Sequence, residues 1–282
     1  MSDRQSAGRM LVRGIVHSPA GLVSALFIGF LIAVAVFGPL LYPGDPLAIS
    51  DNPMLRPGAA HLLGTDDLGR DVLGELVYGV RVSLFVGCVA AFAATVMGTL
   101  IGAIAGYVGG WLDTTVMRIA EFFQVMPSFI LAVVIVALMG PGLLRVVAVI
   151  ALLSWPQTAR VARGEVLRVS QLDFVNGVRC LGVPEWRILV REIMPNSIGP
   201  VLALGTLIVG YAILLEASLS FLGLSSPDVV SWGRILSVGQ RFLFSAWWLS
   251  VFPGLAIFLT VLAFNLLGDA LGDILNPRRA HA

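Results

Sequence analysis

The residues that could carry chemistry are few and widely spaced in this sequence. The three histidines, His17, His61 and His281, lie far apart, and so do the two cysteines, Cys88 and Cys180. This spacing predicts neither a disulfide framework nor a pair of metal ligands, and it brings no nucleophile, base and orienting group together. The sequence therefore argues against a metal centre and against a membrane enzyme.

All 18 basic residues are arginines, so the chain contains no lysine. A phosphate-binding loop of the Walker type requires a lysine that reaches the phosphates of the nucleotide. This chain therefore cannot form such a loop. If nucleotide energy drives its function, another subunit must supply that energy.

The composition indicates an integral membrane protein. Charged residues make up 12% of the 282 residues and hydrophobic residues 57%, whereas an average soluble domain has about 25% charged residues. A soluble enzyme, a disordered chain and a nucleic-acid binder are therefore poor fits. Six transmembrane helices of about 20 residues each would use about 120 residues, which leaves loops but no large soluble domain.

Apolar runs locate six predicted transmembrane helices; five runs carry no charge, and the fifth carries one carboxylate, Glu216. We expect them at 21–41, 82–112, 122–144, 146–159, 193–224 and 242–268. The first run is too long for the apolar core of a cleaved signal peptide, so we expect this helix to be retained. The fourth run is too short to span, and its helix must extend into both flanks or have its ends shielded by protein.

Six helices place both termini on one side of the membrane. If that side is the cytoplasm, it carries twelve arginines and the other side carries six. Basic residues favour the cytoplasmic side, so the prediction is an all-α protein with both termini inside. The expected parts are a cytoplasmic tail (1–20), the first helix (21–41), an outer loop (42–80), a core of helices two to six (81–275) and a cytoplasmic tail (276–282).

Glu216 is the one carboxylate well inside a predicted transmembrane helix. It lies about 25 Å along the helix from the inner end near Gly199, in the outer part of a bilayer core about 30 Å thick. An ionisable group at that depth is a candidate for the translocation path. A structural hydrogen bond to a neighbouring helix is the alternative, and the sequence favours neither.

Small residues recur every four positions along the second predicted helix. They are Ala90, Ala94, Gly98, Gly102, Gly106 and Gly110. Such a face lets two helix backbones approach closely within a membrane. It indicates either packing within this bundle or contact with a second membrane subunit.

The segment 160–196 is long, cytoplasmic in this topology and rich in charges of both signs. Residues 173–181 are typical of a short helix, which Gly182 ends at a C-cap-like position. Pro184 opens a second short helix, and Pro195 is expected to end it before the fifth span. The two helices present apolar residues that need a partner surface: Phe174, Val178, Leu181 and Trp186.

Residues 176–195 resemble the cytoplasmic signature of permease subunits of binding-protein-dependent ABC importers. That signature opens with Glu-Ala-Ala, has a glycine six positions after the glutamate and ends in Ile-x-Pro; here Asn176-Gly177-Val178 replaces its opening. The resemblance implies a loop that couples to an ATPase, made of Asn176, Gly177, Val178, Arg179, Leu181, Gly182, Trp186, Ile193 and Pro195.

A second set of blocks is similar to the second permease of peptide and nickel importers. The residues 61–73 and 78–84 match its loop after the first helix, and 217–224, 231–233 and 264–269 match further blocks. The resemblance implies functional residues in the extracytoplasmic loop: Gly64, Thr65, Asp66, Gly69, Arg70 and Asp71.

The resemblance implies a multi-pass protein of the bacterial inner membrane with the type I fold of ABC importer permeases. It implies a heterodimer with a related permease, two cytoplasmic ATPase subunits that bind ATP and Mg²⁺, and an extracytoplasmic substrate-binding protein. The chain itself would need no cofactor and would contact membrane lipid but no nucleic acid. Closure of the ATPases on ATP would move the coupling loop and turn the path outward, and hydrolysis would reset it.

Three functions are weighed on this basis. The first is a permease for dipeptides or oligopeptides, and the second is a permease of the same fold for nickel or another small solute. A self-contained secondary transporter is the third, but it would predict internal repeats and several charges inside the membrane. The sequence has one such charge, and that reading leaves the segment 160–196 unexplained.

Overall fold

The computed structural model describes residues 14–226 and 228–275, and every regular element within these ranges is a helix. The elements are α2 (Pro19–Leu41), α3 (Val72–Val108), α4 (Gly110–Val125), α5 (Ser128–Met139), α6 (Leu143–Ser170), α7 (Asp173–Cys180), α8 (Glu185–Ile188), η1 (Leu189–Ile193), α9 (Met194–Phe221), α10 (Trp232–Gly239), η2 (Gln240–Phe242) and α11 (Trp248–Leu275). Five helices are long and apolar enough to cross a membrane, and α4 with α5 makes a sixth crossing if the bent pair is one span. The predicted all-α membrane fold is therefore confirmed.

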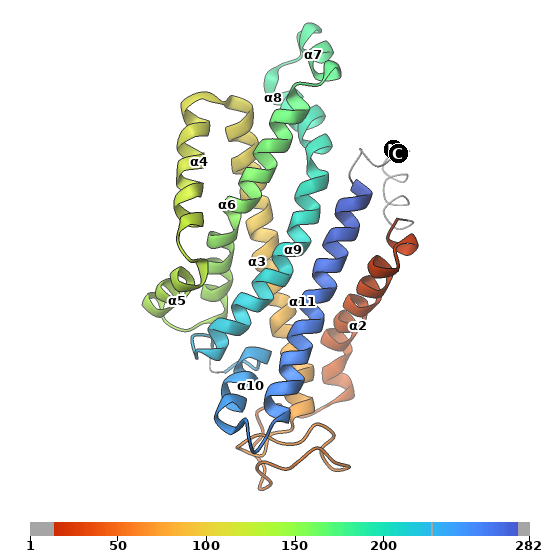
Figure 1. Ribbon diagram of the computed structural model, residues 1–282, viewed down its shortest axis with the longest axis vertical. Coiled ribbons are helices and arrows are strands. Elements are labelled where there is room, and N and C mark those ends of the chain that lie inside the picture. Colours follow the sequence, from red (N-terminus) through yellow and green to blue (C-terminus); the bar gives the residue numbers. More distant parts are fainter. Residues whose placement is uncertain (1–13, 227, 276–282) are drawn as a thin grey trace.

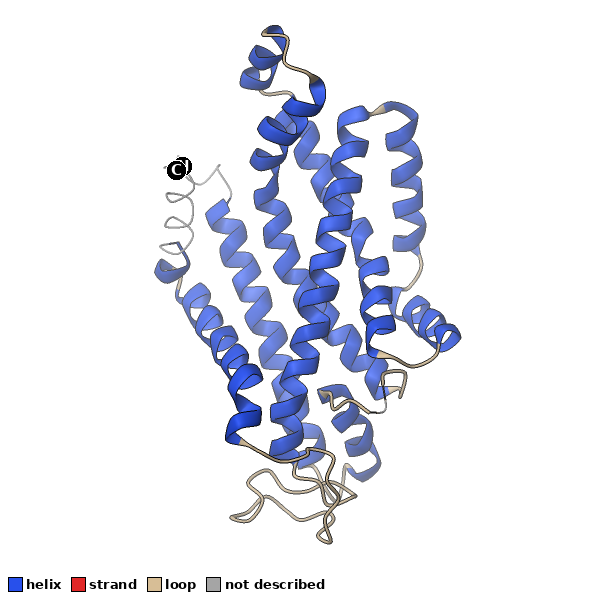
Figure 2. Ribbon diagram, turned by 180° about the vertical axis from the view of Figure 1, so that it is seen from behind, coloured by secondary structure: helices blue, strands red, loops and turns tan. Residues whose placement is uncertain are grey.

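The long helices lie side by side in one bundle, with different structures at its two ends (Figure 1). The short helices α7 and α8 project from one end, and the described parts of the chain begin and finish toward that same end (Figures 1 and 2). The long loop between α2 and α3 and the helix α10 lie at the opposite end. This arrangement fits the prediction of both termini on one side, while the assignment of that side to the cytoplasm stays a prediction.

The stripe of small residues on α3 packs against α6 of the same chain. A Cβ atom at Gly98 would lie 2.6 Å from the carbonyl oxygen of Trp155, and one at Gly106 would lie 3.0 Å from that of Arg163. A Cβ atom at Gly102, between them, would meet the backbone of Ala159. The glycines thus allow the two helix backbones to touch, which confirms packing within the bundle for this part of the stripe.

The third span departs from the expected single helix at 122–144. The chain forms α4 and α5 instead, which meet at an angle of 90°. The break falls at Met126 and Pro127, where the proline ring cannot continue the hydrogen bonding of a helix. The crossing also begins earlier, at Gly110, and the ion pair between Asp113 and Arg163, with Nε and Oδ1 2.5 Å apart, fixes its start to α6. The prediction of a single helix at 122–144 was wrong in its start and in its continuity.

The fourth span extends into both flanks, as its short apolar run required. The helix α6 is 28 residues long and is the most deeply buried of the candidate spans. The helix α3 likewise begins at Val72, inside the segment expected to be the loop 42–80. Both helices therefore carry charged turns beyond their apolar runs.

Pro195 does not end the helix before the fifth span, contrary to expectation. The chain continues from Glu185 through η1 into α9 and forms a single helical run as far as Phe221. Pro195 lies near the start of α9, inside this continuous run, where it removes one backbone hydrogen bond without ending the helix. The wide turn of η1 directly precedes it. One continuous helix thus connects the projecting segment at one end of the bundle to the other end.

Candidate functional site

The segment from α7 to α8 forms an elbow that projects beyond the bundle (Figure 1). The helix α7 ends at Cys180, and Gly182 has a φ of 73°. Residues other than glycine rarely adopt this left-handed conformation, so Gly182 permits the sharp reversal between the two helices. Pro184 is the N-cap of α8. The predicted positions of the turn and of the second helix start are confirmed.

One side of the elbow is anchored on the ends of α3 and α6. Val175, Ile188 and Ile193 are fully buried in a cluster with Ala103 of α3 and Val166 of α6. Val178 is half-buried against the same cluster. The prediction that Val178 needs the surface of a partner protein was therefore wrong. The burial of these side chains holds the elbow in a fixed position on the bundle.

The other side of the elbow presents apolar side chains to its surroundings. Phe174 is 43% exposed, Trp186 63% and Leu181 81%. The guanidinium of Arg187 lies over the ring of Trp186, 5.6 Å from its centre. Large apolar side chains gathered at the tip of a projecting segment are typical of a protein interface.

Polar contacts fix the angle of the elbow. Arg179 of α7 donates to Asn176 Oδ1 at 3.3 Å and lies 3.5 Å from Glu185 Oε2 of α8. The hydroxyl of Tyr107, at the end of α3, donates to the same carboxylate. Residues from three helices therefore meet at Glu185, a residue that sequence reasoning did not select.

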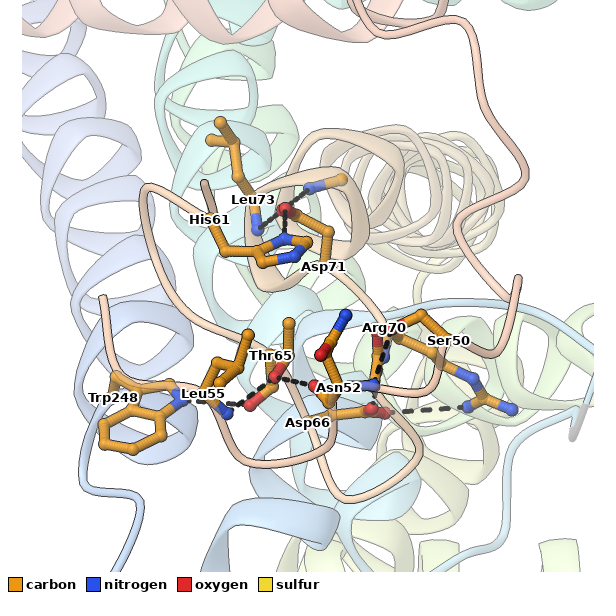
Figure 3. Close-up of polar contacts among 12 residues, drawn as sticks. Ser50, Asn52, Leu55, His61, Thr65, Asp66, Arg70, Asp71, Leu73 and Trp248 are labelled. Atoms are coloured by element: carbon orange, nitrogen blue, oxygen red, sulfur yellow. Dashed lines mark hydrogen bonds and ion pairs between the residues drawn. The ribbon is translucent and has the colours of Figure 1, made fainter. Parts of the chain in front are cut away.

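The outer loop is folded around Thr65 (Figure 3). The hydroxyl of Thr65 accepts from the N–H of Leu55 and donates to the carbonyl of Asn52, both at 2.8 Å. The carbonyl of Thr65 accepts from the indole N–H of Trp248, at the start of α11, at 3.1 Å. Thr65 and Trp248 are fully buried, so this loop is fixed to the membrane helices rather than free above them.

Asp66 forms the tight turn that follows. Its Oδ1 accepts from the N–H groups of Leu68 at 2.9 Å and Arg70 at 2.7 Å (Figure 3). Burial raises the pKa of Asp66, and the two backbone donors and the charge of Arg70 oppose that effect. Gly69 closes the turn with a φ of 77°, and a Cβ atom there would meet the backbone of Ser50.

Asp71 joins the loop to α3. Its Oδ1 caps the helix by accepting from the N–H of Leu73 at 2.8 Å, and its Oδ2 lies 2.7 Å from Nδ1 of His61 (Figure 3). The hydroxyl of Tyr42, at the end of α2, faces the same carboxylate. Burial and then the charge of Asp71 raise the pKa of Tyr42 to about 12. The predicted loop residues Gly64, Thr65, Asp66, Gly69, Arg70 and Asp71 thus come together in one structured unit.

Glu216 is fully buried near the outer end of α9. Its Oε1 accepts from the hydroxyl of Ser220 at 2.6 Å. The hydroxyls of Ser83 on α3 and Ser231, the N-cap of α10, also face this carboxyl group. The structure therefore places Glu216 between three elements of its own chain.

A cavity of about 880 Å³ opens between α6, α9 and α11 at the end of the bundle that carries the elbow. Its lining includes Glu165, Arg168, Asn196, Asp269 and Asp273. The sequence blocks did not single out this group, because its members come from three helices that are far apart in the chain.

The comparisons with known proteins agree with this geometry. Residues 98–281 match the family model described as the inner membrane component of binding-protein-dependent transport systems. The chain is 39% identical over 269 residues to the glutathione transport system permease protein GsiD of Pectobacterium atrosepticum, covering 94% of this chain and 89% of the relative. It is 39% identical over 275 residues to the dipeptide transport system permease protein DppC of Alkalihalophilus pseudofirmus, covering 97% and 90%.

A third relative is the probable D,D-dipeptide transport system permease protein DdpC of Escherichia coli. It is 35% identical to this chain over 273 residues, which cover 96% of this chain and 92% of the relative. The chain belongs to the family of inner membrane components of binding-protein-dependent transport systems. It is a multi-pass permease subunit of an ABC importer, as the sequence predicted.

Proposed function

We propose that this chain forms, together with a related permease, the path through which an ATP-driven importer carries short peptides across the bacterial inner membrane. The peptide class is supported by the names of the relatives, which concern dipeptides, D,D-dipeptides and glutathione. All three are short peptides or peptide-like molecules. The cavity of about 880 Å³ between α6, α9 and α11 is large enough to hold a solute of this size, and we assign it as the inner mouth of the path.

The observation that carries the proposal is the elbow. It is anchored on α3 and α6 and exposes Phe174, Leu181 and Trp186 at its tip. We propose that these side chains dock into a cytoplasmic ATPase subunit, because they are apolar and the chain has no Walker loop of its own. The continuous helix from Glu185 to Phe221 would carry the movement of the elbow through the membrane.

The test is uptake by the reconstituted system. The chain, its partner permease, the two ATPases and the binding protein of the same system are placed in vesicles, and labelled dipeptide, glutathione and Ni²⁺ are offered separately. ATP-dependent uptake of a peptide, lost in Leu181→Asp, is the expected result. Uptake of Ni²⁺ alone would contradict the substrate class, and normal peptide uptake by Leu181→Asp would contradict the role of the elbow.

A further inference from the structure

Glu216 faces away from the side of α9 that lines two larger pockets. The cavity at the elbow end is lined on α9 by residues between Asn196 and Leu207, and a second pocket near the other end is lined by Leu214, Ser218 and their neighbours. Two residues along a helix correspond to a rotation of about 200°. Glu216 therefore points to the opposite side of α9 from both Leu214 and Ser218, toward α3 and α10.

The buried polar side chains around Glu216 come from three separate elements. We call it the Glu216 cluster; it consists of Glu216 and Ser220 on α9, Ser83 on α3 and Ser231 before α10. All four residues are at most 4% exposed. The hydroxyl of Ser231 accepts from the N–H of Arg234 at 3.4 Å, which leaves its hydrogen free to be donated to the carboxyl group.

The cluster is incomplete on the side of α3. Among the described residues, Glu216 Oε2 and Ser83 Oγ are both buried without a hydrogen-bond partner, although they face each other. Leaving buried polar atoms unpaired is unfavourable. A small shift of α9 against α3 would pair these two atoms, so the cluster is sensitive to the relative position of the two helices.

Close packing next to the cluster holds the start of α10 against the bundle. A Cβ atom at Gly233 would meet the backbone of Ala217 on α9, and one at Gly79 of α3 would lie 2.8 Å from the ring of Trp232. The indole N–H of Trp232 donates to the carbonyl of Leu76 at 3.2 Å. The start of α10 is thus held by α3 and α9 at the same point where the cluster lies.

We infer that Glu216 is a positioning residue that fastens α10 to α3 and α9, and that it is not part of the translocation path. The helix α10 lies at the end of the bundle that carries the outer loop, and α9 runs from there to the elbow (Figure 1). Resting on the proposed function, the cluster links the surface that receives the substrate-binding protein to the helix that ends at the ATPase contact.

The test compares two variants of Glu216 in the complete complex. Glu216→Leu removes every hydrogen bond of the carboxyl group, whereas Glu216→Gln keeps an acceptor oxygen. We expect Glu216→Leu to lower the stimulation of ATP hydrolysis by loaded binding protein about tenfold or more, with basal hydrolysis unchanged. Backbone amide exchange within α10 should be faster in this variant. Glu216→Gln should match the unchanged protein in both measurements.

Ser231→Gly is a second variant that tests the inference if the Glu216→Leu chain does not fold and accumulate in the membrane. Glycine is nearly as good an N-cap as serine, so this variant removes mainly the hydroxyl that faces the carboxyl group. It should show intermediate losses in both measurements. Ser218→Ala is the matched control, because Ser218 lies at the same depth and its hydroxyl donates to the carbonyl of Leu214 in its own helix.

Three results would overturn the inference. They are full stimulation in Glu216→Leu, a Glu216→Gln variant as defective as Glu216→Leu, and unchanged exchange of α10 in Ser231→Gly. An equally defective Glu216→Gln variant would show that the charge of Glu216 matters, and Glu216 would again be a candidate for the translocation path. If the unchanged complex lacks stimulation by any binding protein, the proposed function fails, while the exchange of α10 still tests the role of Glu216.

Discussion

Thr65 holds the outer loop through one hydroxyl that both accepts and donates. Thr65→Val keeps the shape of the side chain but leaves the N–H of Leu55 and the carbonyl of Asn52 without this partner. Both hydrogen bonds are partly buried, and each contributes about 0.5–1.5 kcal/mol. We expect the variant to lose about 2 kcal/mol of stability, measured as a lower Tm of the purified complex.

Thr65→Ser is the control for this prediction, because it keeps the hydroxyl and removes only a methyl group. It should recover most of the lost Tm. Equal losses in the serine and valine variants would show that the methyl contact, and not the pair of hydrogen bonds, holds the loop.

Asp66 should make stability depend on pH in a specific direction. Burial raises its pKa in the folded protein, so the folded chain holds this proton to a higher pH than the unfolded chain does. The contribution of the group to stability is therefore full below about pH 4 and falls as pH rises through the folded pKa. The Tm of the unchanged complex, relative to that of Asp66→Asn, should decrease as the pH rises above about 4.

Asp51 provides a matched control in the same loop, because it is an exposed carboxylate. The pH profile of Asp51→Asn should follow that of the unchanged complex. If the Tm of the unchanged complex rises with pH relative to that of Asp66→Asn, the sign is opposite to the prediction. That result would contradict burial as the main cause of the pKa shift.

At the scale of elements, the elbow depends on the conformation of Gly182 and not on space around it. A Cβ atom at Gly182 would meet nothing within 4 Å, but its φ is 73°. A side chain in that conformation costs about 1–2 kcal/mol. We expect Gly182→Glu to distort the elbow, to abolish ATP-driven uptake and to leave the chain in the membrane, as measured by uptake and by the amount of membrane-bound chain.

Gly164 on α6 is the control for the elbow. It also has open space around a Cβ atom, but no left-handed φ, and it lies in a helix where alanine is favoured over glycine. Gly164→Ala should transport normally. Normal transport by Gly182→Glu would show that the angle of the elbow is not needed for coupling.

The sequence predicted the elements whose signals are local. The first and sixth spans follow from uninterrupted apolar runs, and the fifth follows from an apolar run with one charge, Glu216. The Gly182 turn follows from one residue type. The third span was misplaced because Pro127 ends a helix that starts among polar residues at Gly110. Apolar runs alone do not mark that start, and an ion pair to Arg163, distant in the chain, stabilises it.

Among the candidate sites, the sequence also predicted the one whose residues are close in the chain and missed those that several helices build together. The outer loop was found because its residues lie within eleven positions of one another, from His61 to Asp71. The direction in which Glu216 points depends on the rotation of α9 against α3 and α10. The pattern of residues along one helix does not reveal that rotation. The role of Glu185 likewise requires Tyr107 and Arg179 to meet it from two other helices.

At the scale of the whole molecule, the orientation in the membrane rests on the arginine count, twelve against six. The structure adds that the elbow lies at one end of the bundle and the loop before α11 at the other (Figure 1). The two cysteines of the chain make this orientation measurable. Cys180 is exposed on the elbow, and Cys88 lies within the membrane-spanning part of α3.

A thiol reagent that cannot cross membranes should therefore distinguish the two ends. In Cys88→Ser, the remaining Cys180 should react in inverted vesicles and stay unlabelled in intact spheroplasts, because basic residues place the elbow in the cytoplasm. In a chain without its native cysteines, Ser245→Cys introduces a thiol in the exposed turn before α11, and it should show the opposite pattern. Labelling of Cys180 in intact spheroplasts would place the elbow outside, where no ATPase could reach it, and both the topology and the proposed coupling would then be wrong.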